Sequence, residues 1–304
     1  MTTASGDQPP LDGLNTDGLD LGGTETIIGV TVPSALGDIV ADRFWQLGVR
    51  AVSEVDVGDG LVEVSSSVGN EQASVDRAIA TFDADWSVRV TSAPVAGADD
   101  WKQFARPVEY APGAFIVPSW NPTPTEPHVE RVTVIEPGSA FGLGDHPTTT
   151  GSMQLVADVL SGAARDDESA VESVLDVGCG TGALAILAAQ MGVPTIRAID
   201  VAIAAVDATL HNADLNDVAG RIDVDTTPIA ALERTYDLVV ANILAPVLVS
   251  LADDLVRLTA PGGSLIISGI LEERHDHVLA ALAPLAPSQS VVRDGWITIR
   301  LTHP

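Results

Sequence analysis

Cysteine and lysine are almost absent from the 304-residue chain, since each occurs only once. The lone cysteine, Cys179, excludes an intramolecular disulfide and a cysteine metal cluster, and we expect no metal. No apolar run reaches the roughly eighteen residues of a membrane-spanning helix, so no membrane association is expected. The N-terminus also lacks the basic and apolar regions of a signal peptide. We therefore predict a cytoplasmic protein whose residues 1–25 form a disordered, acidic tail.

Basic residues are greatly outnumbered by acidic ones, 15 against 42, which gives a formal net charge of −27. Such a chain is repelled by phosphate backbones, so we expect no direct nucleic-acid partner and consider a basic protein plausible. A salty habitat or a GC-rich genome explains the same composition more simply. The charge alone therefore says little about the substrate.

The hydrophobic pattern divides the rest of the chain into three parts. Residues 26–92 follow the order strand, helix, strand, strand, helix, strand, which predicts a small N-terminal α+β domain of the ferredoxin-like type. Residues 93–135 are rich in proline and aromatic residues and predict a connector with one or two short strands. Residues 136–304 alternate strands and helices, which predicts a doubly wound α/β sheet.

The strands expected in the last part are near-continuous apolar runs, as a buried parallel sheet requires. Single helices are expected over residues 245–259 and 272–285. Near the end, Asp294-Gly295 separates two alternating segments, which is a strong signal for an antiparallel hairpin.

The segment LDVGCGTGAL joins a strand to a helix through closely spaced glycines. Gly178 and Gly180 let the backbone turn tightly and approach a ligand. The G-x-G-x-G spacing differs from the G-x-G-x-x-G of dinucleotide sites, and the lack of a lysine argues against a P-loop. Asp176 at the strand end suits a ligand with a cationic end, such as the sulfonium and ammonium groups of S-adenosylmethionine. An ordinary α/β turn is the alternative.

Two further polar residues end strands of the same sheet. Asp200 follows the next strand, where an acid can bind both ribose hydroxyls of a cofactor; a helix N-cap is the alternative. Asn242 ends the strand VVAN, and its amide oxygen, with the carbonyl groups of Ile243 and Leu244, could accept hydrogen bonds from an amine. We predict that Asn242 is the catalytic residue, because methyl transfer depends on alignment of the amine. A turn residue is the alternative.

Five segments carry a family resemblance: AFGLGDHPTT, LDVGCGTGALAI, AID, VVANILA and PGGSLIISGIL. Together they resemble the ribosomal protein L-eleven methyltransferase family, S-adenosylmethionine-dependent enzymes of the seven-stranded, Rossmann-like methyltransferase class. The resemblance extends over roughly residues 26–300. It implies that the N-terminal domain recognises the substrate and that amines of a ribosomal protein, lysine side chains or the N-terminal amine, become methylated.

The resemblance also implies that the cofactor is contacted through Thr149, Gly178, Asp200 and Asn242. The family usually has Phe-Gly-Thr-Gly where this chain has Leu143 between two glycines, so a hydroxyl near the cofactor is lost.

The segment AFGLGDHPTTT precedes an amphipathic helix. We hypothesise that Phe141 and its glycines cover the methionine end of the cofactor, and that Thr149 donates its hydroxyl to the cofactor. The alternative is a cluster of N-capping residues. His146 is a candidate general base, but a histidine before a proline more often orients the backbone. We therefore do not assign it to catalysis.

Three other functions stay open at this point. A methyltransferase of the same build could act on another protein, such as an electron-transfer flavoprotein subunit, or on a small molecule. A nicotinamide oxidoreductase is disfavoured by the glycine spacing. A non-catalytic ribosome-assembly factor could retain the cofactor fold. We expect a monomer that acts on free ribosomal protein.

Overall fold

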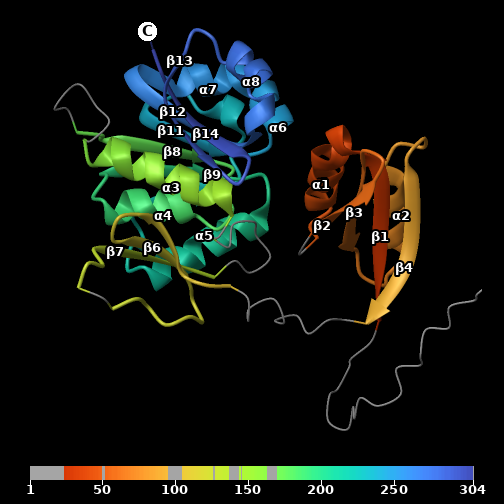
Figure 1. Ribbon diagram of the computed structural model, residues 1–304. Helices are drawn as coiled ribbons and strands as arrows, with labels where there is room; N and C mark the ends of the chain where they lie inside the picture. The colour runs from red at the N-terminus through yellow and green to blue at the C-terminus, as the bar shows by residue number, and fades with distance from the viewer. Residues whose placement is uncertain are drawn as a thin grey trace, which may run out of the picture.

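The structure, a computed structural model, describes a series of segments with gaps between them: residues 24–49, 52–94, 105–125, 127–136, 144, 146–162 and 170–303. Three sheets are formed by the strands of these segments (Figure 1). Most of the expected N-terminal tail lies outside the described residues. None of the described helices is long and apolar enough to cross a membrane.

The first sheet has four antiparallel strands in the order β2-β3-β1-β4. Its elements are β1 (Thr24–Pro33), η1 (Ser34–Leu36), α1 (Gly37–Gln46), β2 (Ser53–Gly58), β3 (Leu61–Ser67), α2 (Gln72–Thr81) and β4 (Ser87–Pro94). Alternate residues of β1, Ile28 and Val30, are fully buried, and Phe44 of α1 packs against Phe82 with ring centroids 4.8 Å apart. This four-stranded unit therefore has a hydrophobic core of its own.

A second sheet has three short strands in the order β5-β6-β7: β5 (Val108–Ala111), β6 (Ala114–Pro118) and β7 (Arg131–Ile135). The sequence predicts only one or two strands here. The third strand escapes prediction because β6 and β7 pair in parallel across an intervening proline-containing loop, and a local pattern does not reveal such a partner. The sheet packs against three helices, α3 (Pro147–Leu160), α4 (Ala183–Gln190) and α5 (Ile203–Leu215) (Figure 1).

Side-chain amides of two helices hold the backbone of β7 in place. Asn216, the C-cap residue of α5, accepts from Val134 N–H at 2.8 Å and donates to Val134 C=O at 2.7 Å. Asn212, one turn earlier and fully buried, accepts from Glu136 N–H at 2.8 Å and donates to Glu136 C=O at 3.0 Å. Gln190 of α4 donates to the neighbouring Val132 C=O at 2.9 Å. These amides replace the hydrogen bonds that a neighbouring strand would make.

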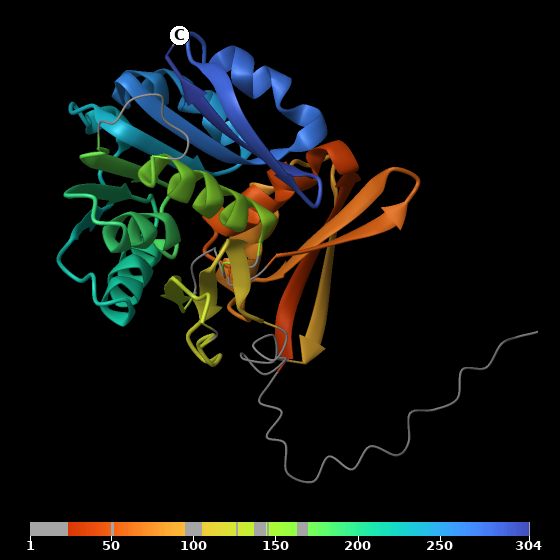
Figure 2. The ribbon, with the colours of Figure 1, turned by 60° about the vertical axis from the view of Figure 1, so that its left-hand side comes forward.

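The third sheet is the largest, with seven strands in the order β10-β9-β8-β11-β12-β14-β13. Its strands are β8 (Ser173–Val177), β9 (Thr195–Ile199), β10 (Ile222–Asp225), β11 (Tyr236–Asn242), β12 (Thr259–Leu271), β13 (Ala286–Arg293) and β14 (Trp296–Thr302). The first five in the spatial order are parallel, and β14 runs antiparallel to both neighbours. The predicted terminal hairpin, drawn in the darkest blue in Figure 2, is confirmed, with Asp294 and Gly295 at φ of 48° and 79°.

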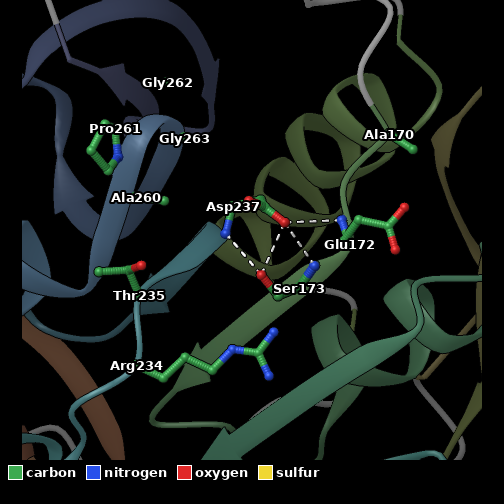
Figure 3. Close-up of a pocket in the computed structure, with 10 residues that line it drawn as sticks. All are labelled: Ala170, Glu172, Ser173, Arg234, Thr235, Asp237, Ala260, Pro261, Gly262 and Gly263. Atoms are coloured by element: carbon green, nitrogen blue, oxygen red, sulfur yellow. Dashed lines mark hydrogen bonds between the residues drawn. The ribbon is translucent and has the colours of Figure 1, made fainter.

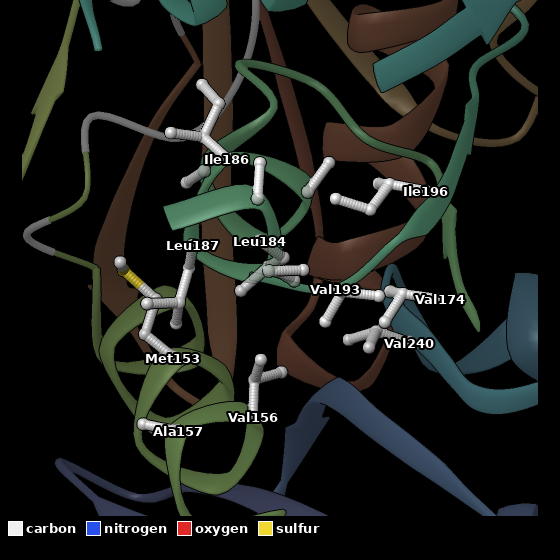
Figure 4. Close-up of a cluster of buried hydrophobic side chains, with 14 of the residues drawn as sticks. Met153, Val156, Ala157, Val174, Leu184, Ile186, Leu187, Val193, Ile196 and Val240 are labelled. Carbon is white, nitrogen blue, oxygen red and sulfur yellow. The ribbon is translucent and has the colours of Figure 1, made fainter. Parts of the chain in front are cut away.

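Helices cover both faces of this sheet (Figure 1). They are α3 (Pro147–Leu160), α4 (Ala183–Gln190), α5 (Ile203–Leu215), α6 (Ala245–Ser250), α7 (Ala252–Leu258) and α8 (Asp276–Ala281), with 3-10 turns η3 (Ile229–Ala231) and η4 (Glu272–Arg274). Alternate strand residues point to opposite faces, so Val174 belongs to the same buried cluster as Met153 of α3 and Leu187 of α4 (Figure 4), whereas Leu175 belongs to the cluster that includes residues of α6, α7 and α8. This is the doubly wound α/β arrangement that the sequence predicts.

Two predicted helices differ in the structure. The helix expected over residues 245–259 is divided at Leu251, but Leu251 N–H still bonds to Val247 C=O and Leu255 N–H to Leu251 C=O. The division is therefore a local bend, which sequence periodicity does not register. The helix expected over residues 272–285 is shorter, because η4 takes its first turn and α8 ends at Ala281.

Candidate functional site

The candidate site lies at the carboxyl edge of the large sheet, where the strand order reverses. β8 lies between β9 and β11. From β9 the next strand, β10, is added on one side of β8, whereas from β11 the next strand, β12, is added on the other side. Open α/β sheets bind ligands at such a point. Asp176, Asp200 and Asn242 lie at or next to the carboxyl ends of these three strands.

The glycine loop after β8 keeps its N–H groups within the chain. Gly178 and Cys179 both donate to Ile199 C=O, at 2.8 and 3.1 Å, and Gly180 donates to Asp200 Oδ2 at 3.0 Å. Gly182, which precedes α4 with φ of 80°, donates to Cys179 C=O at 2.8 Å. A phosphate cradle would present these N–H groups to the ligand. The loop geometry therefore disfavours a pyrophosphate and argues against a nicotinamide cofactor.

Asp176 is a buried acid directly before this loop, with 1% of its surface exposed. The pKa of its carboxyl is raised from the ordinary value near 3.8 to about 7, chiefly by burial; the hydrogen bond from the Ala185 N–H lowers the pKa in part, and the nearby Asp200 carboxylate adds to the rise. Ala185 N–H donates to Asp176 Oδ2 at 3.2 Å. A cation bound at this edge would favour the charged form of Asp176.

Asp200 joins two loops through its carboxylate. Its Oδ2 accepts from Gly180 N–H at 3.0 Å and its Oδ1 from Ala202 N–H at 2.9 Å. The N-cap position of α5 is Ala202, so Asp200 is not the N-cap residue itself. Each carboxylate oxygen can accept further hydrogen bonds, which leaves capacity for hydroxyl donors of a ligand.

Asn242 is the last residue of β11 and pairs with Ser268 of β12. Its side chain is partly exposed and makes no hydrogen bond to the described part of the chain. The next residue, Ile243, places its Cγ2 where a Cβ on Gly178 would come within 2.5 Å. The segment after β11 therefore lies directly against the glycine loop after β8.

Thr149 lies in the first turn of α3. It is 3% exposed, and its Oγ1 has no hydrogen-bond partner among the described residues. Two residues later, a Cβ on Gly151 would come within 2.6 Å of Thr298 Oγ1, which bonds to Ser268 Oγ at 2.8 Å. Ser268 is the strand partner of Asn242. The first turn of α3 thus approaches the strand next to Asn242.

His146 is the N-cap residue of α3. Its Nδ1 accepts from Thr148 N–H at 3.3 Å and lies 2.7 Å from Thr148 Oγ1, and its ring contacts Trp296 edge to face with centroids 5.2 Å apart. These contacts support an orienting role. Phe141 and Leu143 lie outside the described residues.

Asn212 is a site-supporting residue that the sequence analysis does not identify. Besides Glu136, its amide nitrogen donates to Thr181 C=O in the glycine loop at 2.9 Å. It therefore connects that loop to the end of β7. The asparagine pair at 212 and 216, four residues apart on one helix, is a signal that could have found it.

A cavity among the described residues lies elsewhere. It measures about 440 Å³ and is lined at the opposite, amino-terminal edge of the sheet by residues before β8 and β11, including Glu172 and Arg234 (Figure 3). There Asp237 Oδ2 accepts from Glu172 N–H, Ser173 N–H and Ser173 Oγ, each at 2.9 to 3.0 Å. These bonds tie together the starts of the two strands, and no predicted site residue is present.

Cys179 behaves as a packing residue. Burial raises the pKa of its thiol far above the ordinary range, so the thiolate needed for nucleophilic attack is disfavoured. Within the described segments, no group of three or more histidine, cysteine, aspartate or glutamate residues is arranged to hold a metal ion.

The strand order, the antiparallel final strands and the loops at the carboxyl edge define a Rossmann-like α/β methyltransferase fold. The family model for ribosomal protein L11 methyltransferase (PrmA) matches residues 58–304. The chain therefore belongs to the ribosomal protein L11 methyltransferase family.

Individual relatives agree with this family. The ribosomal protein L11 methyltransferase of Geotalea daltonii is 33% identical over 286 residues, covering 85% of this chain and 91% of the relative. That of Cupriavidus metallidurans is 40% identical over 212 residues, covering 67% of this chain and 65% of the relative. The match to the Pelobacter propionicus protein covers 58% of that relative. The crystal structure of a ribosomal protein L11 methylase from Lactobacillus delbrueckii subsp. bulgaricus superposes with a TM-score of 0.57 at 28% identity, covering 66% of this chain and 99% of that one.

Proposed function

We propose that this protein transfers methyl groups from S-adenosylmethionine to amines of ribosomal protein L11, at lysine side chains, the N-terminal amine or both. The observation that carries the proposal is the Asn242 amide, which lies at the carboxyl edge, beside the glycine loop, without a hydrogen-bond partner in the described segments. Membership of the family supports the choice of substrate.

The residues at the edge fit S-adenosylmethionine. The buried Asp176 carboxyl suits a cationic methionine end, and Asp200 can accept from ribose hydroxyls. Gly178 and Gly180 allow close approach, while Thr149 offers a buried hydroxyl that has no described partner. We propose Phe141 as a further contact. When bound, S-adenosylmethionine supplies an electrophilic methyl group on its sulfonium sulfur.

Asn242 would orient the acceptor amine. Its amide oxygen, with the carbonyl group of Ile243, would accept hydrogen bonds from the N–H groups of a neutral amine, so that the nitrogen lone pair is directed at the methyl group. The Leu244 carbonyl, which the sequence also suggests as an acceptor, instead accepts from the N–H groups of Val247 and Leu248 at 2.9 and 3.0 Å at the start of α6. Positioning of this kind supplies a large part of the rate of a displacement reaction. We propose that the amine loses its proton to water before the transfer.

The remaining proposals concern the parts of the chain. We assign residues 26–92 to a ferredoxin-like substrate-recognition domain, which the order β2-β3-β1-β4 supports. Residues 93–135 form the connector, and residues 136–304 the methyltransferase domain. The net charge of −27 suits a basic protein substrate and not a nucleic acid, and the proposed active form is a monomer.

Methyl transfer from isotope-labelled S-adenosylmethionine into unmethylated ribosomal proteins, measured by intact-protein mass spectrometry, tests the proposal. We expect label on L11 and, with the Asn242→Ala variant, a loss of about 100-fold in kcat at nearly unchanged cofactor affinity. Asn216→Ala, at an asparagine remote from the edge, is the matched control for amide removal. Label on another protein, such as an electron-transfer flavoprotein subunit, would redirect the substrate assignment. Cofactor binding without label on any protein would favour a small-molecule substrate or a silent assembly factor.

A further inference from the structure

Ile243, the residue after Asn242, lies close to two glycines, Gly178 in the loop after β8 and Gly269 in β12. A Cβ on Gly178 would lie 2.5 Å from Ile243 Cγ2, and a Cβ on Gly269 would lie 2.2 Å from the Ile243 carbonyl oxygen. Both glycines have positive φ, 73° and 86°. Neither position therefore accepts a side chain without movement of Ile243.

The two contacts come from the segments of β8 and β12, the two strands that flank β11 in the sheet. Gly178 belongs to the glycine loop after β8, which the proposed function assigns to the cofactor. Gly269 follows Ser268, the strand partner of Asn242, and lies where the pairing of β12 with β14 is irregular, between Ile267 and Ile270. Such an irregularity bends the strand and redirects the backbone. Here it brings the backbone of β12 against the carbonyl group of Ile243.

We propose that Ile243 is a positioning residue, held by Gly178 and Gly269, that fixes the Asn242–Leu244 segment relative to the cofactor loop. The contact of its carbonyl group with Gly269 sets the direction of that carbonyl, and the contact of its Cγ2 with Gly178 sets the spacing to the cofactor. The proposal rests on the proposed function for the role of the segment. The contact itself is independent of the substrate.

The first experiment tests the acceptor side with Gly269→Ala. A Cβ at this position forces the Ile243 carbonyl to move by about 1 Å, and misplacement of that size costs about 100-fold in kcat. We expect cofactor affinity, measured by calorimetry with S-adenosylhomocysteine, to change less than about threefold. Gly192→Ala is the control, because Gly192 has a φ of 90° but no atom within 4 Å of the added Cβ. An equal effect of the two variants on kcat would overturn the proposal.

The second experiment tests the cofactor side by a double-mutant cycle. Gly178→Ala should weaken cofactor affinity about tenfold or more through collision with Ile243 Cγ2, and Ile243→Ala, which removes Cγ2, should recover most of that loss. Ile243→Val, which keeps Cγ2, should recover none. Additive effects of Gly178→Ala and Ile243→Ala would overturn the proposal. Thermal unfolding of each variant identifies those that fail to fold. Ile243→Val is a small change in side-chain volume, so its cofactor affinity can be measured even if Ile243→Ala does not fold.

These results separate the inference from the proposed function. The double-mutant cycle uses cofactor affinity alone, so it holds or fails whichever protein is methylated. If the wild-type protein labels no ribosomal protein but the cycle shows coupling, the substrate assignment fails and the Ile243 contact stands. If the wild-type protein labels L11 but the cycle is additive, the substrate assignment stands and the proposed role of the Ile243 contact fails.

Discussion

The Asp176→Asn variant should be more stable than the wild type at neutral and alkaline pH. Burial raises the pKa of Asp176 from near 3.8 to about 7, so the folded state binds this proton more tightly than the unfolded state does. Between these two values, a rise in pH ionises the unfolded chain first, and the folded state loses relative stability. A pKa difference of about 3 corresponds to about 4 kcal/mol of unfolding free energy, lost as pH rises from about 4 through about 7.

An asparagine at position 176 cannot ionise and still accepts from the Ala185 N–H. We expect urea unfolding from pH 4 to pH 8.5 to show a small difference between variant and wild type at low pH. The difference should grow in favour of the variant up to about pH 7 and then stay constant, reaching a few kcal/mol. The same variant should bind the cofactor less well, because it has lost the negative charge.

Asp225→Asn provides a control of opposite sign. The pKa of Asp225 is lowered to about 2, chiefly by its hydrogen bond with Arg197 at 2.6 Å. Its stabilisation is therefore present above the ordinary pKa near 3.8 and is lost as pH falls through about 2, so the variant should be less stable than wild type at neutral pH. Parallel stability curves for wild type and Asp176→Asn would refute the reasoning about burial.

Two further substitutions test other parts of the site. Thr149→Val removes a buried hydroxyl that has no described partner, so the free protein should be as stable or slightly more stable in thermal unfolding, while the cofactor Kd rises about tenfold. Ser152→Ala, which removes another buried hydroxyl without a described partner, is the control. Unchanged cofactor affinity in Thr149→Val would reject the cofactor contact. Asn212→Ala removes the hydrogen bonds of this amide to Glu136 N–H, Glu136 C=O and Thr181 C=O and should lower the unfolding free energy by about 3 kcal/mol in urea titration; a loss below about 1 kcal/mol would mean that water replaces the amide.

Local signals predicted the fold well where the structure depends on neighbouring residues. The hairpin at Asp294-Gly295 follows from turn chemistry, because both residues adopt positive φ. The strand–loop–helix junction at Gly178 to Gly182 follows from spacing. The third strand of the small sheet and the bend at Leu251 depend on partners distant in sequence, so periodicity did not reveal them.

In the candidate site too, some features follow from local sequence and others depend on distant residues. Asp176, Asp200 and Asn242 were identifiable because each lies at or beside a strand end, and strand ends of a parallel sheet gather at one edge. The raised pKa of Asp176 depends on burial, which no local pattern reports. Ile243 and Gly269 are 26 positions apart and meet only because β11 and β12 pair. A hydrophobic residue and a strand glycine carried no signal for such a contact.

The amides that hold β7 determine which substitutions would disturb this strand. Asn212 and Asn216 recognise carbonyl and N–H groups, which are the same for every amino acid except proline. The strand is thus recognised by its backbone, whatever side chains it carries. Substitution of a side chain on this strand leaves these hydrogen bonds in place, whereas substitution of either asparagine removes them. The path that leads the chain toward the site is therefore encoded about eighty residues downstream, in a helix.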